Sequence, residues 1–125
     1  MSKTALLFAG QGAQVVGMGR DLADKYPSAQ ALFDRANEVL DYDLTQVCFE
    51  GPEDALTQTE NAQPGIFLVS WVALELLKEQ VPDLSFEAAA GLSLGEFTAL
   101  TAAGVMSFEN GLKIVRQRGR FMQEA

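Results

Sequence analysis

The run Gly91-Leu92-Ser93-Leu94-Gly95 decides the fold, because it fits the G-x-S-x-G pattern that places a serine on a sharp turn between a strand and a helix. Residues 86–90 are typical of a short strand, and residues 94–103 are helical in pattern and end at Gly104. A side chain at either flanking glycine would collide where strand and helix meet. We therefore predict that Ser93 is a nucleophile held clear of the backbone, with a plain helix N-cap as the alternative.

The rest of the chain also alternates between strand and helix patterns. Leu6 to Phe8 predicts a strand that ends in a glycine-rich loop at residues 9–14. Helical patterns follow at residues 20–25 and 29–40, the second capped by Ser28. Shorter helical pieces are expected around Asp43 and after Gly51-Pro52.

Two longer helices complete the pattern. Gln63-Pro64 is expected to open an apolar, central helix that runs to about Gln80, since proline is tolerated in a first turn. Ser107 is expected to cap a final amphipathic helix. The order predicts an α/β fold with short parallel strands and flanking helices, in which both glycine-rich loops lie at one site, at the carboxyl ends of the strands.

The first glycine-rich loop does not match a nucleotide-binding motif. Val15 stands where a dinucleotide fingerprint needs glycine, and Met18-Gly19 stands where a phosphate-binding loop needs lysine and Ser/Thr. The exposed amides and glutamines of residues 10–14 suit an oxyanion instead. An ordinary connecting turn is the alternative.

Arg118 is the most informative residue of the last helix. A helical wheel places it within an arc formed by Leu112, Ile114, Val115, Phe121 and Met122. A cation on a core-facing arc needs a buried carboxylate or an anionic ligand. Its planar fork suits a carboxylate, whereas a snorkelling arginine is the alternative.

Other charged or reactive residues are assigned structural roles. Glu96 lies in the first turn of the helix after Ser93, where the helix dipole stabilises its negative charge. On the helix it is poorly placed as a base. Lys113, Arg116 and Arg120 are expected to form a solvated face, with an acidic protein partner as the less favoured interpretation. Cys48 is interpreted as a small buried apolar residue.

Composition narrows the function further. The 125 residues are 48% hydrophobic and carry a net charge of −8, so they can build one core and disfavour nucleic acid as a partner. The chain has one cysteine and no histidine, which argues against a metal site built from those ligands. We expect a cytoplasmic protein with no signal peptide and no membrane contact.

Four segments together resemble the malonyl-CoA:acyl carrier protein transacylases of fatty acid synthesis. They are residues 8–14, Gln63-Pro64, residues 91–96 and Arg116-Gln117-Arg118-Gly119, and their order and spacing agree with that family. The resemblance covers residues 1–125, which make up about the first two-fifths of such an enzyme. It implies the first part of an α/β-hydrolase-like large subdomain, with the ferredoxin-like small subdomain and the carboxyl-terminal part lying outside this chain.

The resemblance also implies a mechanism and site residues. Malonyl-CoA acylates Ser93, coenzyme A leaves, and the phosphopantetheine thiol of acyl carrier protein accepts the malonyl group. Gln11 and Leu94 are expected to supply oxyanion-hole amides, Arg118 to bind the malonyl carboxylate, and Gln63 to line the pocket. No cofactor or metal is expected besides the substrate malonyl-CoA, and the full-length protein is expected to be a monomer.

The sequence departs from the family in three ways. Leu92 replaces the usual histidine beside the nucleophile, and Ala9 replaces the usual proline before Gly10. The family's general base is a later histidine that this chain does not contain, so these residues alone should have little activity. An esterase of the α/β-hydrolase class and a non-catalytic carrier-binding remnant are the alternative functions.

Overall fold

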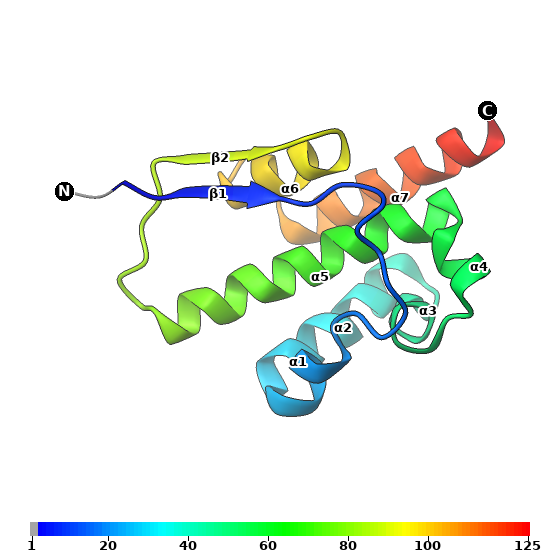
Figure 1. Cartoon of the computed structure of the whole chain (residues 1–125), viewed down its shortest axis with the longest axis horizontal. Helices are drawn as coiled ribbons and strands as arrows, with labels where there is room; N and C mark the ends of the chain where they lie inside the picture. Colours follow the sequence, from blue (N-terminus) through cyan, green and yellow to red (C-terminus); the bar gives the residue numbers. More distant parts are fainter. Residues whose placement is uncertain (1–2) are drawn as a thin grey trace.

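A computed structural model describes residues 3–125 as a small parallel sheet with helices packed beside it. The strands β1 (Ala5–Phe8) and β2 (Ala88–Gly91) pair in parallel, from Ala5 opposite Ala88 to Phe8 opposite Gly91. Figure 1 shows both strands running side by side, with the long helix α5 (Thr59–Gln80) crossing beneath them. The predicted fold class, α/β with short parallel strands and flanking helices, is confirmed.

Most of the predicted helices lie where the sequence placed them. The other helices are α1 (Arg20–Lys25), α2 (Pro27–Leu40), α3 (Leu44–Glu50), α4 (Glu53–Thr57), α6 (Leu94–Ala102) and α7 (Phe108–Glu124). The predicted cap of the last helix is confirmed, because the Ser107 hydroxyl accepts a hydrogen bond from the Asn110 amide. The predicted stop at Gly104 is also confirmed, since that residue follows α6 with a positive φ of 84°.

Three local predictions are wrong. Ser28 does not cap α2, because the helix already begins at Pro27 and the Ser28 hydroxyl donates instead to Glu79. The strand predicted from residue 86 begins at Ala88. The helix α5 begins at Thr59, so Pro64 lies inside it rather than in its first turn.

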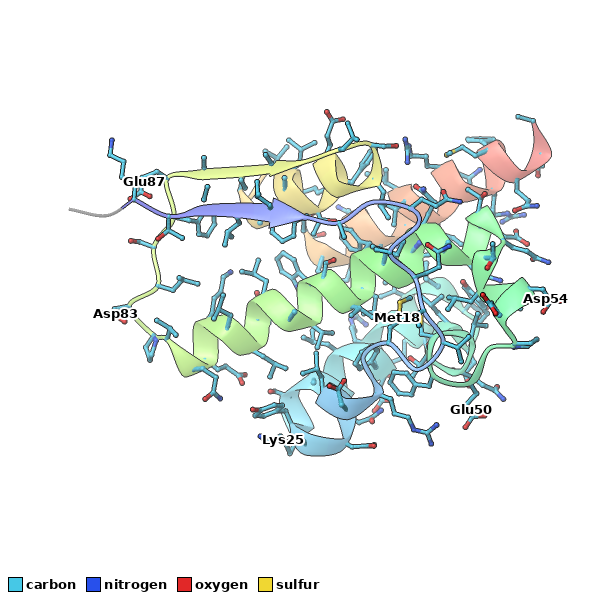
Figure 2. All side chains as sticks on the ribbon, viewed as in Figure 1. Met18, Lys25, Glu50, Asp54, Asp83 and Glu87 are labelled. Carbon is cyan, nitrogen blue, oxygen red and sulfur yellow. The ribbon has the colours of Figure 1, made fainter. Side chains whose placement is uncertain are left out.

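The core is built around α5, as its apolar sequence predicted. Its buried residues include every position from 62 to 68, and the Phe67 ring stacks on Phe108 of α7 with centroids 6.0 Å apart. Cys48 is fully buried, and desolvation raises the pKa of its thiol to about 12, which agrees with an apolar packing role. Met18 points inward to pack on the core, whereas Lys25, Glu50 and Asp54 point away from it (Figure 2).

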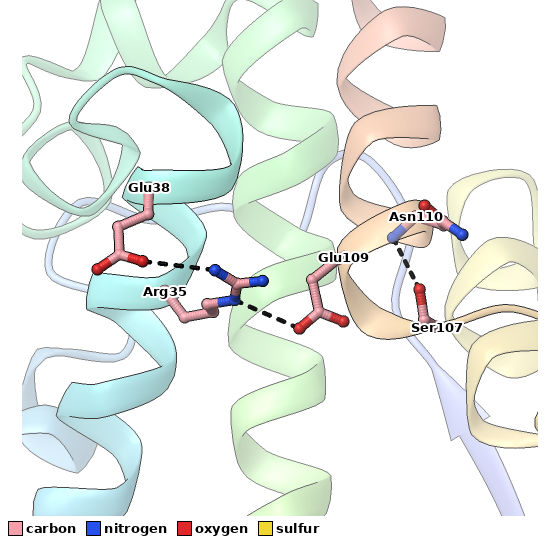
Figure 3. A network of polar contacts seen from close by, with 5 residues as sticks. All are labelled: Arg35, Glu38, Ser107, Glu109 and Asn110. Atoms are coloured by element: carbon pink, nitrogen blue, oxygen red, sulfur yellow. Dashed lines mark hydrogen bonds and ion pairs between the residues drawn. The ribbon is translucent and has the colours of Figure 1, made fainter.

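Helix α2 is joined to the start of α7 by an arginine. Arg35 of α2 pairs with Glu109 at 3.4 Å and with Glu38 one turn along its own helix, also at 3.4 Å (Figure 3). All three side chains are largely solvated, so each pair contributes little to stability. The same view shows the Ser107 cap on the first turn of α7.

Within residues 3–125, no helix has the length and hydropathy required to cross a membrane.

Candidate active site

Ser93 lies on the turn that joins β2 to α6. Its backbone has φ 56° and ψ −110°, an unusual conformation for a residue with a side chain. Such strain costs on the order of 1–3 kcal/mol and is concentrated at functional sites. The side chain makes no capping hydrogen bond to α6, so the interpretation of Ser93 as an ordinary N-cap is wrong.

The two glycines of the motif permit this turn for steric reasons. A methyl group at Gly91 would overlap the backbone of Gly95, and one at Gly95 would overlap the carbonyl oxygen of Phe8. The helix α6 therefore begins directly against both strands. The predicted collision at both positions is confirmed.

The first glycine-rich loop lies next to the serine turn, because β1 and β2 are neighbours and run in the same direction. The Ala13 amide donates to the Gly10 carbonyl across a tight turn whose central residues are Gln11 and Gly12. A Cβ at Gly10 would stand 2.8 Å from the Leu92 carbonyl oxygen, so only glycine permits this approach. The prediction that both loops lie together at the carboxyl ends of the strands is confirmed.

A chain of hydrogen bonds links this loop to the serine. Gln11 Oε1 accepts from Gln63 Nε2 at 2.8 Å, and Gln63 Oε1 accepts from Arg118 Nη1 at 2.5 Å. Arg118 Nη2 then donates to Ser93 Oγ at 2.8 Å. Three elements and the first loop thereby bring together Gln11, Gln63, Ser93 and Arg118, four residues selected from the sequence.

The environment of Arg118 favours an anion. Its guanidinium lies 5.2 Å from the centre of the Phe97 ring and is half-buried. Among residues 3–125, no carboxylate pairs with it, so its charge is met only by neutral oxygens and a ring face. A partly desolvated cation of this kind binds a carboxylate with charge-assisted hydrogen bonds.

Leu94 and Glu96 are placed differently from each other. Leu94 is the first residue of α6, so its amide lies at the helix N-terminus, where no intrahelical acceptor exists, although its side chain is fully buried. Glu96 is exposed in the first turn of the same helix and lines a hollow over β2 with Ala89 and Leu100. That hollow lies away from Arg118, so Glu96 keeps the structural role assigned to it.

The predicted apolar arc of α7 is only partly correct. Leu112 and Val115 are fully buried, whereas Ile114, Phe121 and Met122 are exposed and surround a surface hollow with Phe97 and Arg118. The buried face instead continues through Gly111 and Gly119, which lie directly against α5. A helical wheel missed this because it counts apolar side chains and ignores glycine contacts.

Arg116 is the second correction on α7. It does not belong to the solvated face formed by Lys113 and Arg120, which are exposed. Its guanidinium lies 4.0 Å from the centre of the Tyr42 ring and donates to the Glu60 carbonyl and to Asn61 Oδ1, each at 3.1 Å. The wheel could not reveal this role because the partners come from other helices.

Two supporting residues were missed altogether. Thr59 accepts from Gln11 Nε2 at 3.2 Å, and its amide donates to Gln123 Oε1 at 2.8 Å. Phe97, four residues after Ser93 and therefore on the same side of α6, supplies the ring beside Arg118. The helical spacing of Phe97 was a usable signal, whereas nothing local indicated Thr59.

A strained serine on the turn between a parallel strand and a helix is an arrangement typical of the α/β-hydrolase class of folds. More narrowly, the chain belongs to the acyl transferase domain family, whose family model matches residues 5–125.

Similar proteins of known sequence or structure are named as malonyl transacylases. The malonyl CoA-acyl carrier protein transacylase of Bacillus subtilis (strain 168) is 48% identical over 127 residues, covering 100% of this chain and 39% of that protein. The crystal structure of the transacylase from Clostridium perfringens has a TM-score of 0.91 at 41% identity, covering 98% of this chain and 38% of that one. A malonyl-transacylase in complex with a type II PKS acyl-carrier protein also has a TM-score of 0.91, at 37% identity, with 98% and 40% covered. The chain thus spans about two-fifths of these relatives.

Proposed function

We propose that the longer protein containing this chain transfers a malonyl group from malonyl-CoA to the phosphopantetheine thiol of acyl carrier protein. The observation that carries the proposal is the contact of Arg118 with both Ser93 Oγ and Gln63. It is supported by the names of the relatives and by the relative that was solved with an acyl-carrier protein.

The proposed transfer has two steps, acylation of Ser93 and transfer of the malonyl group to the carrier thiol. Ser93 Oγ attacks the thioester carbon, its proton passes to a base, and the carbon–sulfur bond breaks as coenzyme A leaves and regains a proton. The carrier thiol then attacks the malonyl ester, and the serine oxygen leaves as the alcohol. The amides of Gln11 and Leu94 are assigned to the oxyanion that forms in each step, with Leu94 favoured by its place at the helix N-terminus.

The position of Arg118 matches the malonyl group in particular. A single methylene separates the malonyl carboxylate from the carbon that Ser93 attacks, so both ends must be held within a few ångströms of each other. Arg118 Nη2 lies 2.8 Å from the nucleophilic oxygen, which is the required proximity. Gln63 is fully buried and orients the other guanidinium nitrogen, so we assign it to the pocket wall.

The base is assigned to residues beyond this chain. The 125 residues contain no histidine, and a serine hydroxyl without a base is a poor nucleophile near neutral pH. We propose that residues 1–125 form the first part of the large subdomain, and that the remaining part and a small subdomain supply the base. We further propose that the complete protein is a cytoplasmic monomer that needs no cofactor besides its coenzyme A substrate.

Intact-mass analysis tests the proposal directly. The full-length enzyme should gain one malonyl group from malonyl-CoA in the absence of carrier, and Ser93→Ala should abolish the adduct. Ser28→Ala is the matched control, because that hydroxyl only donates to Glu79 at the surface. A wild-type protein that forms no adduct would support the non-catalytic alternative and sink the proposal.

A further assay separates transfer from hydrolysis. Arg118→Ala should reduce kcat/KM for malonyl-CoA by roughly 10²-fold, as expected for a lost charge-assisted clamp, while acetyl-CoA is affected far less. Rapid release of free malonate, with no transfer to carrier protein, would favour the esterase alternative.

A further inference from the structure

The helix α5 contains a proline where its backbone cannot be regular. In an α-helix the amide of residue 64 would donate to the carbonyl of Glu60, but Pro64 has no N–H. The turn immediately before Pro64 therefore has an acceptor without its helical donor. This turn also carries Gln63, the residue that orients Arg118.

Arg116 supplies the missing donor. Its Nη1 lies 3.1 Å from the Glu60 carbonyl oxygen and 3.1 Å from Asn61 Oδ1. Its guanidinium also lies 4.0 Å from the centre of the Tyr42 ring. None of the ion pairs within residues 3–125 involves Arg116, so its described polar contacts go to this turn.

The surroundings hold Arg116 in one position. Tyr42 donates its hydroxyl hydrogen to Asn61 Oδ1 at 3.1 Å, and the Asn61 amide nitrogen donates to the Ala55 carbonyl at 3.0 Å. Burial raises the pKa of Tyr42 well above its usual value, so the phenol stays neutral and remains a donor across the working pH range. The contacts of Arg116 therefore join α7 to Tyr42, in the segment before α3, and to the first turns of α5.

The same turn is also pressed by α7 from a second point. A Cβ at Gly119 would stand 2.7 Å from the Thr59 carbonyl and 3.3 Å from Gln63 Cβ. Arg116 and Gly119 thus contact two sides of the same turn of α5. Arg118, which lies between them in sequence, donates to Gln63 on that turn. Displacement of that turn moves Gln63 away from both Arg118 and Gln11.

We propose that Arg116 is a positioning residue for the carboxylate-binding arginine: by capping the Glu60 carbonyl that Pro64 leaves open, it fixes Gln63 and thereby the direction of Arg118. The inference rests on the proposed malonyl transfer. It assigns to Arg116 a role in selecting a carboxylate-bearing acyl group, although Arg116 does not touch the serine.

The test is the ratio of kcat/KM for malonyl-CoA to that for acetyl-CoA in the full-length enzyme. Arg116→Ala should lower this ratio about tenfold, because small misplacements of a positioning group are costly in rate, while turnover of acetyl-CoA stays within about twofold. Arg116→Lys should recover part of the ratio, since it restores one donor without the planar fork. Arg120→Ala, an exposed neighbour on the same helix, is the matched control and should leave the ratio unchanged.

Pro64→Ala provides an independent test that does not depend on Arg116→Ala folding well. Alanine returns an N–H to residue 64, so the Glu60 carbonyl regains a helical donor. In that background, Arg116→Ala should lower the malonyl-to-acetyl ratio by less than about threefold, as expected when coupled groups no longer depend on each other.

The outcomes distinguish the two proposals. A wild-type enzyme that transfers no malonyl group refutes the proposed function. A wild-type enzyme that does so, but whose selectivity is the same in Arg116→Ala and Arg120→Ala, overturns the role of Arg116 alone. Equal losses with both substrates also overturn it, because they indicate a general structural role.

Discussion

Two regions of the molecule differ in how completely they bury their apolar side chains. One is the contact between α5 and α7, and the other is the sheet formed by β1 and β2. Between the helices, Phe67, Leu112 and Val115 are fully buried, and Gly111 and Gly119 let the two backbones approach closely. In the sheet, Leu7 is 81% exposed and no residue of either strand is buried. Parallel sheets are usually covered on both faces. The sheet is therefore the region with most apolar surface left to bury.

Ser93 and Arg118 lie on opposite sides of this boundary. The serine follows the exposed strand β2, whereas the arginine extends from the well-packed helix α7. This chain's stability therefore comes mainly from the helical side, which carries Arg118. Ser93 lies where the packing is least complete.

Truncating the helical core should have the largest effect. Phe67 is fully buried against Phe108, so Phe67→Ala should lower the free energy of unfolding by about 3–5 kcal/mol. Urea denaturation followed by circular dichroism measures the change. A loss below about 1 kcal/mol would show that the helical side is not the main source of stability.

High pH should weaken the same side of the molecule. Burial raises the pKa of the folded Cys48 thiol from its usual 9.0 to about 12, so above pH 9 the unfolded state loses the thiol proton first. The Cys48 contribution is fully present below that pH, and stability should fall by up to about 1.4 kcal/mol per pH unit as pH rises toward 12. The denaturation midpoints of wild type and Cys48→Ala should differ by a constant amount below pH 9, and the difference should shrink above it. Parallel curves would contradict this.

Relieving the serine turn should have a smaller effect of opposite sign. Ser93→Gly removes strain of about 1–3 kcal/mol but adds backbone entropy to the unfolded chain, so a net gain of about 1 kcal/mol is expected. The variant should also form no malonyl adduct. Ser107→Gly is the control, because Ser107 has an ordinary extended backbone and loses its cap. It should destabilise the protein or leave it unchanged.

Changing the exposed sheet face should have the smallest effect. Leu7→Thr keeps a residue suited to a strand and removes an apolar side chain that is mostly in water. Its effect on stability of the isolated chain should be within about 0.5 kcal/mol. A loss comparable to that of Phe67→Ala would mean that the sheet face is covered in solution.

Local sterics made the serine turn predictable from sequence. The spacing of Gly91, Ser93 and Gly95 has one good steric solution between a strand and a helix, and the strand order then brings Gly10 to the same place. Arg118 was identifiable because a charge next to apolar positions is costly and needs a reason.

What sequence reasoning missed depends on contacts between distant segments. The start of α5 was placed too late because proline is usually confined to a first turn, and only the structure shows that Arg116 compensates for it. The exposure of Phe121 and Met122 could not be read from α7 alone, since it depends on where α5 begins. Thr59 and Gln123 were missed for the same reason.

The pairing of β1 with β2 has a consequence for folding. Thr4 and Glu87, which flank the paired strands, are 83 residues apart in the sequence, so forming the sheet closes a loop that contains α1 to α5. Contacts over such separations form slowly, because the entropy of loop closure is lost before the pairing is gained. The helices can pack together earlier in folding, because their contacts join residues that are closer in the sequence. The serine turn and its neighbouring loop are then among the last parts of this chain to become ordered.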